Sequence, residues 1–122
     1  MGPQQFELKS LNSPDEVRKF EKGKVELVTI AGALVGRATF EPGWKWSNHV
    51  KPIAKTNSCQ VAHFGYQVSG ALTTRMDDGT EKTSRAGDVV NIPPGHDAWV
   101  SGNEPVVVID FQGMVDYAKA GR

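Results

Sequence analysis

The sequence of 122 residues contains a single cysteine, Cys59, and only three histidines. One thiol excludes an internal disulfide framework and suits a reducing compartment, so we expect a cytoplasmic protein. The 14 basic and 14 acidic residues cancel, which argues against a nucleic acid or a membrane surface as the main partner. No apolar run is long enough to span a bilayer, and the first ten residues show no apolar signal core.

Internal repeats, low-complexity tracts and linkers are also missing. A chain of this length can bury one core, so we expect a single domain at residues 13–122, preceded by an arm at 1–12. The tail at 113–122 is a candidate for a short helix.

One helix start is clear in the stretch "SPDEVRKF". Ser13 is a good N-cap, Pro14 suits the first helical position, and Glu16 completes a capping box. We therefore predict a short N-terminal helix that ends at Gly23.

The rest of the chain reads as short strands separated by Gly, Pro and Asn. "KVELVTI" is a β-rich alternating segment, and Asp78-Gly79 inside "RMDDGTEKT" favours a hairpin. "PVVVIDF" is typical of a strand buried on both faces, or of an edge covered by another subunit. Many short strands with few helical patterns predict an all-β, antiparallel sandwich or barrel.

The stretch "GDVVNIPPGHDAW" places Gly87, Pro93 and Gly95 around a rigid turn. This spacing resembles the second motif of the cupins, which is a Gly, five residues, Pro-x-Gly, two residues and a His. The His position holds Ala98, two residues after His96. The resemblance covers about residues 40–112, with motif-like regions at 43–70 and 87–103. It implies an antiparallel double-sheet jelly-roll barrel.

The first cupin motif is a Gly, five residues, His-x-His, three or four residues, a Glu, six residues and a Gly. Gly43 and His49 match its start, and Lys51 replaces the second His. Eleven residues, "PIAKTNSCQVA", then intervene before His63, which stands in the Glu position six residues ahead of Gly70. Cupins that bind Fe, Zn, Ni or Mn use three His and one Glu, so this chain keeps only part of that set.

Strand alternation indicates which side chains share a face. If residues 43–51 are extended, His49 and Lys51 lie on one face, opposite Trp44 and Trp46. Along 61–69, His63 and Gln67 share a face opposite Phe64 and Tyr66, and His96 has the parity of Ala98. The cupin template turns these faces into the barrel. We therefore predict that a divalent transition metal (Fe, Zn, Ni or Mn) is held by His49, His63 and His96.

Three nitrogen donors with an open position suit a catalytic metal, which would acidify a bound water or polarise a substrate oxygen. Gln67 is predicted to orient the substrate or the water. Asp97 or Gln67 could add an oxygen ligand or an outer hydrogen-bond acceptor. The simpler interpretation is that His96 closes its turn and that His49 faces water at a strand end.

Two further side chains have open roles. Lys51 could act as a base or bind an anionic substrate if its environment favours the neutral amine, but it could equally leave the barrel for solvent at Pro52. Cys59, four residues before His63, could be a nucleophile or a soft metal ligand. Without a third orienting group, a lone cysteine is more often a small apolar filler.

Two functions are compatible with the sequence. The first is a metal-dependent cupin that acts on a small organic molecule in the barrel mouth, of oxygenase, isomerase or cyclase type, since the fold does not choose among these reactions. The second is a metal-free module that binds or senses a small molecule with a degenerate metal site. The resemblance and the apolar strands imply a homodimer.

Overall fold

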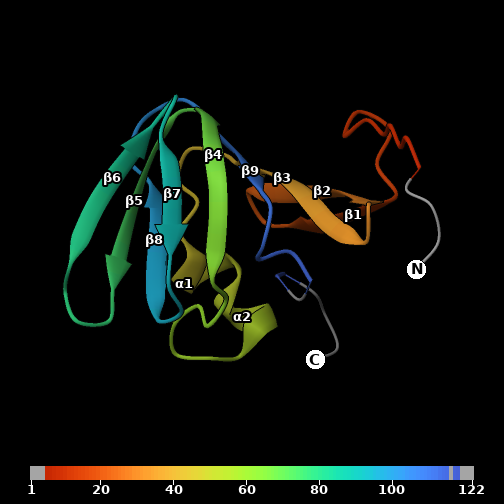
Figure 1. Cartoon of the computed structure of the whole chain (residues 1–122). Coiled ribbons are helices and arrows are strands. Elements are labelled where there is room, and N and C mark those ends of the chain that lie inside the picture. The colour runs from red at the N-terminus through yellow and green to blue at the C-terminus, as the bar shows by residue number, and fades with distance from the viewer. Residues whose placement is uncertain (1–4, 116, 119–122) are drawn as a thin grey trace.

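The computed structural model describes residues 5–115, 117 and 118 of the chain. These residues form nine strands in two antiparallel sheets and two short helices (Figure 1). The larger sheet has the order β1-β2-β3-β9-β4-β7, and the smaller has the order β6-β5-β8. The all-β, antiparallel, double-sheet prediction is confirmed. The strands are β1 (Glu16–Phe20), β2 (Gly23–Ile30), β3 (Ala33–Phe40), β4 (His63–Ser69), β5 (Ala71–Met76), β6 (Glu81–Arg85), β7 (Val89–Ile92), β8 (His96–Val100) and β9 (Val106–Asp110).

The predicted hairpin at Asp78-Gly79 is the connection between β5 and β6. Gly79 has a φ of +93°, a value that glycine adopts without a steric penalty. The Asp78 carboxylate accepts the Thr80 amide at 2.9 Å, which holds the turn.

Strand β9 lies inside the larger sheet, between β3 and β4, so both of its edges are paired within the chain. The edge strand, one of the two alternatives for "PVVVIDF", is therefore wrong. Val106 and Asp110 are buried, and the three residues between them are half-buried. Residue Gly65 of β4 explains how closely the two strands approach. A Cβ at Gly65 would lie 3.2 Å from the Asp110 Cα and nearer still to the Ile109 carbonyl, so a larger residue would push β4 away from β9.

The predicted N-terminal helix is wrong. Residues 16–20 form strand β1, which pairs antiparallel with β2 from Glu16 opposite Leu27 to Phe20 opposite Gly23. Capping residues favour a helix only weakly, and the pairing of a segment with a neighbouring strand outweighs them. Here the extended backbone lets the buried guanidinium of Arg18 donate to the Met114 and Tyr117 carbonyls at 2.8 Å each.

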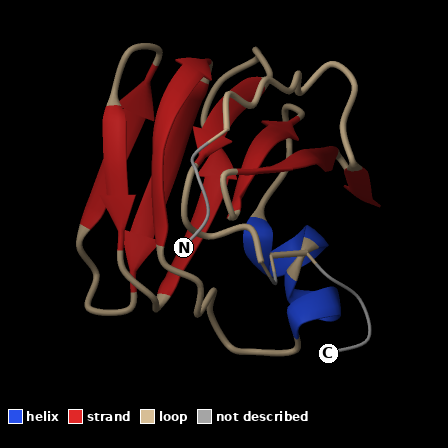
Figure 2. Ribbon diagram, turned by 45° about the vertical axis from the view of Figure 1, so that its right-hand side comes forward, coloured by secondary structure: helices blue, strands red, loops and turns tan. Residues whose placement is uncertain are grey.

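The extended backbone expected for residues 43–51 is also wrong. Helices α1 (Trp46–His49) and α2 (Lys51–Ala54) occupy most of that segment and lie together at one end of the sheets (Figure 2). A helical period places Trp46 and Val50 on one face, and both are buried. The strand pattern predicted that the side chains of His49 and Lys51 share a face. In the helical backbone they do not.

The core fills the space between the sheets. Its aromatic part is built from Phe20, Phe40 and Trp44, and the last two rings stack at 4.0 Å between centroids. Trp44 and Trp46 are 1% and 2% exposed, so both rings pack in this core. Phe64 and Tyr66 lie on the opposite, outward face of β4.

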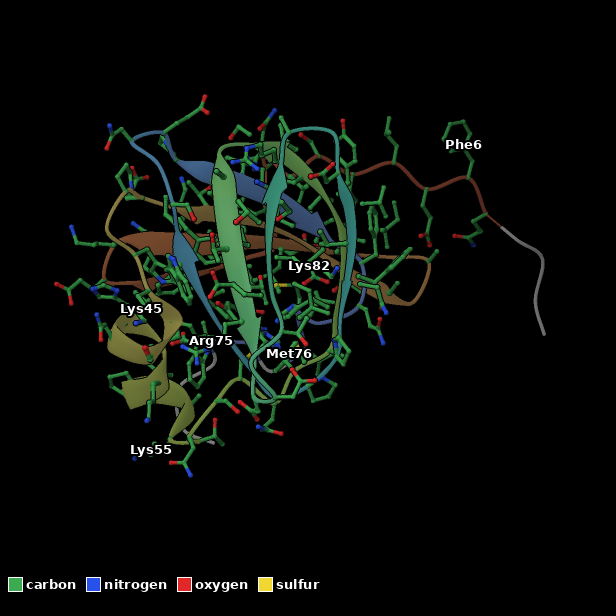
Figure 3. All side chains as sticks on the ribbon, turned by 90° about the vertical axis from the view of Figure 1, so that its left-hand side faces the viewer. Phe6, Lys45, Lys55, Arg75, Met76 and Lys82 are labelled. Atoms are coloured by element: carbon green, nitrogen blue, oxygen red, sulfur yellow. The ribbon has the colours of Figure 1, made fainter. Side chains whose placement is uncertain are left out.

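The described part of the arm, residues 5–12, forms neither helix nor strand, and Phe6 projects away from the rest of the molecule (Figure 3). In the tail, residues 113–115, 117 and 118 form turns, and the remainder of the predicted tail helix lies outside the described residues. No helix in the part of the chain that the structure describes is long and apolar enough to cross a membrane.

Candidate metal centre

Two of the three histidines lie side by side in the interior. His63 begins β4 and His96 begins β8, and both point inward because each has the parity of a buried neighbour, Gly65 and Ala98. The two ring centroids are 5.4 Å apart with an edge-to-face tilt. The alternation argument for β4 and β8 is therefore confirmed by their burial patterns.

Cys59 joins the two histidines through the backbone. Its amide donates to the His96 carbonyl at 2.7 Å, and the Cys59 carbonyl accepts the Gly95 amide at 2.7 Å. This bridge points the thiol at His63, with 3.8 Å between Cys59 Sγ and His63 Nε2. One donor atom each from Cys59, His63 and His96 lies within 4.8 Å of the others. We refer to these three residues as the Cys-His-His cluster.

Asp110 anchors the His63 ring from the neighbouring strand. The Asp110 Oδ2 atom lies 2.5 Å from His63 Nδ1, which leaves Nε2 directed at Cys59. The other carboxylate oxygen accepts the backbone amides of Gln112 and Gly113 at 2.9 and 2.8 Å. A Cβ at Gly113 would lie 2.5 Å from His63 Nδ1, so only glycine leaves room for this contact.

The His96 ring is oriented in the same way. Its Nδ1 lies 2.8 Å from the Pro93 carbonyl, which can only accept, so Nδ1 carries the proton and Nε2 keeps its lone pair. His96 thus does close its turn, as the simpler interpretation held, and still offers one nitrogen to the cluster. An outer acceptor on the second nitrogen is the arrangement of metal-ligating histidines.

The contacts within the cluster and with Asp110 shift the pKa values of Cys59, His63 and Asp110. Burial alone raises the pKa of the Cys59 thiol, but hydrogen bonds and positive charge from His63 and His96 lower it to about 6. Burial alone lowers the pKa of His63, yet Asp110 and Cys59 raise it to about 9. Burial raises the pKa of Asp110, and the contact with His63 outweighs this and lowers it. Without a metal, a thiolate therefore faces an imidazolium around neutral pH.

A cavity of about 60 Å³ lies beside the cluster, between the sheets. His63, His96 and Asp110 form part of its wall, and most of the remaining wall is apolar or aromatic. A larger hollow of about 370 Å³ lies over β5, β6 and β7. Met76 and Lys82, which are labelled in Figure 3, are two of the residues that line it. The two spaces share a wall made of Thr74, Val90 and Ile92.

The structure does not bring His49 to the cluster. His49 ends α1, where its Nδ1 lies 3.0 Å from the Lys45 amide and its Nε2 lies 3.8 Å from Glu21. Within the described residues, no atom of His49 belongs to the group of donors that could hold an ion. The physical reason is the helix, which turns the ring back toward Lys45, the residue that precedes α1.

The other predicted site residues also lie apart from the cluster. Gln67 is fully buried, and its amide nitrogen contacts the carbonyls of Ser69, Gly70 and Ser84 while its oxygen accepts the Ser84 hydroxyl. Gln67 is absent from the wall of the cavity, so its placement favours a role in joining the sheets.

Lys51 and Asp97 make contacts that hold the two short helices. Lys51 is half-buried at the start of α2, where its carbonyl accepts the Lys55 amide. Asp97 accepts the Ser47 amide at 3.1 Å and so ties α1 to β8.

Sequence reasoning missed Asp110, although a signal was present. Alternation along β9 puts Val106, Val108 and Asp110 on one face, so an acidic residue ends an otherwise apolar inward row. A carboxylate 3% exposed needs partners, and its partner is the histidine on the adjacent strand.

Comparison with known proteins supports the architecture. No protein-family model and no curated protein matches the sequence. Solved structures do match. A cupin-like protein from Thermotoga maritima shares 20% identity over 79% of this chain and 72% of that chain, with a TM-score of 0.54. An RmlC-like cupin from Shewanella frigidimarina shares 17% identity over 81% of this chain and 87% of that chain, with a TM-score of 0.52.

Oxalate decarboxylase from Bacillus subtilis also matches, with 25% identity and a TM-score of 0.53 over 81% of this chain. The matched region is 28% of that enzyme, and a related structure of it is described with Mn(II) centres. Two antiparallel sheets with inward histidines, together with these structural neighbours, establish the architecture: the protein is a small cupin-fold protein.

Proposed function

We propose that this protein holds a divalent transition metal ion with Cys59, His63 and His96, and acts with it on a small organic molecule. The observation that carries the proposal is the geometry of the Cys-His-His cluster. Three buried donors lie within 4.8 Å of one another, and the outer nitrogen of each imidazole is already bound to an oxygen. Three protein ligands with a further position open is the pattern of catalytic rather than structural zinc sites.

The donor types narrow the choice of metal. A thiolate with two imidazoles suits zinc, and suits iron or nickel better than manganese, which prefers oxygen ligands. The bound ion would supply Lewis acidity toward a substrate oxygen or a bound water.

The remaining residues of the site hold and shield the metal ligands. Asp110 and Pro93 fix the tautomers of His63 and His96, so that both present an Nε2 lone pair. The apolar wall of the cavity excludes water. Because about 60 Å³ is far below the ~300 Å³ of ordinary ligand pockets, the cavity takes only the reacting end of a molecule.

Elemental analysis tests this proposal. Protein expressed with zinc supplementation is expected to carry about one ion per chain. Substitution of Co²⁺ is expected to give an absorption band from thiolate-to-cobalt charge transfer, and Cys59→Ser is expected to abolish the band. Less than a tenth of an ion per chain, or a cobalt spectrum unchanged in Cys59→Ser, would refute the site.

A second function, free of metal, is favoured by the position of Asp110. The arrangement is that of a nucleophile, a base and an orienting carboxylate. Cys59 Sγ lies 3.8 Å from His63 Nε2, and His63 Nδ1 lies 2.5 Å from Asp110 Oδ2. Asp110 is therefore the third, orienting group that a reactive cysteine needs and that the sequence analysis did not identify. In this alternative the protein binds or senses a small electrophile that reaches Cys59 past His63 and His96, which form part of the cavity wall.

Alkylation separates the two functions. In metal-stripped protein, iodoacetamide is expected to alkylate Cys59, forming a carbon–sulfur bond and releasing iodide, as measured by mass spectrometry. If the site is a metal centre, saturating zinc protects the thiol completely. Equal labelling with and without zinc would favour the metal-free function.

A homodimer in the cytoplasm completes the proposal. Phe64, Tyr66 and Val68 are 44–47% exposed on the outward face of β4, and Val89, paired with Tyr66, is 67% exposed. Such a contiguous apolar face is typical of a subunit contact. Light scattering should report a dimer that Tyr66→Glu dissociates, whereas Val17→Glu, at the far edge of the same sheet, leaves it intact. A wild-type monomer at micromolar concentration would contradict this.

A further inference from the structure

The described part of the N-terminal arm is held to its own domain by alternate residues. The Glu7 carboxylate accepts a backbone amide in the connection between β2 and β3 at 2.5 Å, and the Lys9 ammonium group donates to Asp15 at 2.8 Å. The Leu11 carbonyl accepts the Arg37 guanidinium at 3.2 Å. These contacts fix the arm at the β2–β3 side of the larger sheet.

The residues between these anchors are apolar and face solvent. Phe6 is 95% exposed and Leu8 is 85% exposed, and Phe6 projects away from the rest of the molecule (Figure 3). We refer to these two side chains as the arm row. The anchored arm presents the row to water and not to its own domain, and removal of apolar surface from water is favourable. The arm row is therefore suited to burial against a second surface.

The outward face of the larger sheet carries an apolar surface of its own. Phe64, Tyr66 and Val68 of β4 and Val89 of β7 are exposed there, and Val89 pairs with Tyr66. The amide of Phe111 donates to the Phe64 carbonyl at 2.9 Å, and its side chain adds a further ring that is 51% exposed. We refer to these five residues as the β4 face.

Charge distinguishes this half of the sheet from the other half. The outward rows of β4, β7 and β9 hold only Phe, Tyr, Val, Ile and Asn, at positions 64, 66, 68, 89, 91, 107 and 109. The outward rows of β1, β2 and β3 include Lys19, Lys24, Glu26 and Arg37. Few charges and many aromatic rings are typical of the centre of a protein interface. The β4 face is therefore the half of the sheet that is suited to a partner.

The exposed areas indicate what the partner contributes. Within one copy the arm row and the β4 face do not cover each other, since both are exposed. A standard interface buries about 800 Å² on each partner. At about 150–250 Å² for a complete aromatic side chain, the half-exposed β4 face supplies roughly 450 Å² and the arm row roughly 350 Å². The face alone falls short of a stable dimer, and the face and the arm row together reach it.

We propose that the arm of one copy packs Phe6 and Leu8 on the β4 face of a second copy, and that the second copy returns the same contact. A two-fold axis makes such an interface self-complementary, so each face is covered and each arm row is buried. This inference rests on the homodimer of the proposed function and names the segment of the partner that the β4 face receives.

Two substitutions in the arm test the contact. In the double variant Phe6→Asp/Leu8→Asp we expect the dimer dissociation constant, measured by sedimentation equilibrium, to rise at least about 100-fold. Burial of one such side chain strengthens association about tenfold or more, and the two-fold axis makes each contact twice. Val115→Asp is the matched control, because Val115 is 61% exposed but belongs neither to the arm row nor to the β4 face. It should change the constant less than about twofold.

Photo-crosslinking identifies what the arm contacts. The full chain with Phe6 replaced by p-benzoylphenylalanine is mixed with an excess of ¹⁵N-labelled wild-type chain, irradiated and digested with trypsin. We expect mass spectrometry to find the unlabelled arm peptide joined to ¹⁵N peptides that carry residues of β4 or β7. A labelled receiving peptide shows that the contact is between chains. Tyr66→Glu in the labelled chain should abolish this crosslink.

The outcomes separate this inference from the homodimer itself. Weaker association of the arm variant, together with labelled β4 or β7 peptides, supports the inference. A dimer that Tyr66→Glu dissociates and the arm variant does not overturns the inference and leaves the homodimer standing. Crosslinks only to unlabelled peptides, or to labelled peptides outside the β4 face, overturn it as well. A wild-type monomer overturns both and leaves the metal centre to its own test.

Discussion

Two regions of this protein carry histidines that the sequence predicted as metal ligands. His63 and His96 lie on strands, and His49 lies in a helical segment. In β4 and β8 the side chains alternate, and the inward residues meet Cys59 and Asp110. In α1 the chain turns, and His49 contacts Lys45 and Glu21 instead. The difference teaches that parity is informative only where the backbone is truly extended.

The sharpest test of this comparison removes one histidine from each region. We expect His96→Ala to weaken zinc binding at least about 100-fold, because loss of an outer hydrogen bond alone costs ~10–100-fold and loss of a ligand costs more. His49→Ala should leave zinc affinity within about twofold. Both values come from competition titration with a chromogenic chelator. Equal losses in the two variants would return His49 to the site.

Asp110→Asn probes the orienting contact. An asparagine amide can donate to His63 Nδ1, which moves the ring proton to Nε2 and blocks the nitrogen that faces Cys59. Zinc affinity should fall by about 10–100-fold, measured by the same titration. Asp97→Asn is the matched control, since Asp97 holds the Ser47 amide and not a histidine. Unchanged affinity in Asp110→Asn would mean that Asp110 serves only the fold.

Gly113→Ala tests how closely the strands and the tail must pack around His63. The added Cβ would lie 2.5 Å from His63 Nδ1 and 2.6 Å from the Ala62 carbonyl. We expect a loss of about 1–3 kcal/mol in the free energy of unfolding, the usual range for overpacking, measured in urea. Gly102→Ala, where nothing lies within 4 Å of the new Cβ, should change stability little. Similar losses at both positions would contradict the close approach.

The pH dependence of Cys59 alkylation in metal-free protein gives the smallest effect. The thiolate is the reactive form, and the folded-state pKa of Cys59 is about 6 rather than near 9. The iodoacetamide rate should therefore be nearly constant above pH 7 and fall about tenfold per unit as the pH drops well below 6. A rate that keeps rising to pH 9 would show that His63 and His96 do not stabilise the thiolate.

Much of the fold was predictable from local patterns. The β5–β6 hairpin followed from Asp78-Gly79, and the inward face of β4 followed from alternation. The helix predicted near Ser13 failed because its capping residues describe an isolated segment, whereas pairing with β2 and the buried contacts of Arg18 decide the strand. The extended backbone predicted for residues 43–51 is wrong for the converse reason, because Trp46 and Val50 are buried together only in a helix.

The sequence by itself determined the all-β class, the main hairpin and the inward parity of His63 and His96, because these depend on turn chemistry and on the two-residue period of a strand. Only the tertiary structure decided the donor set. Asp110 meets His63 across 47 residues through the pairing of β4 with β9, and Cys59 meets His96 through a single backbone bridge. Such contacts arise from strand order and register between distant segments, and no local pattern records them.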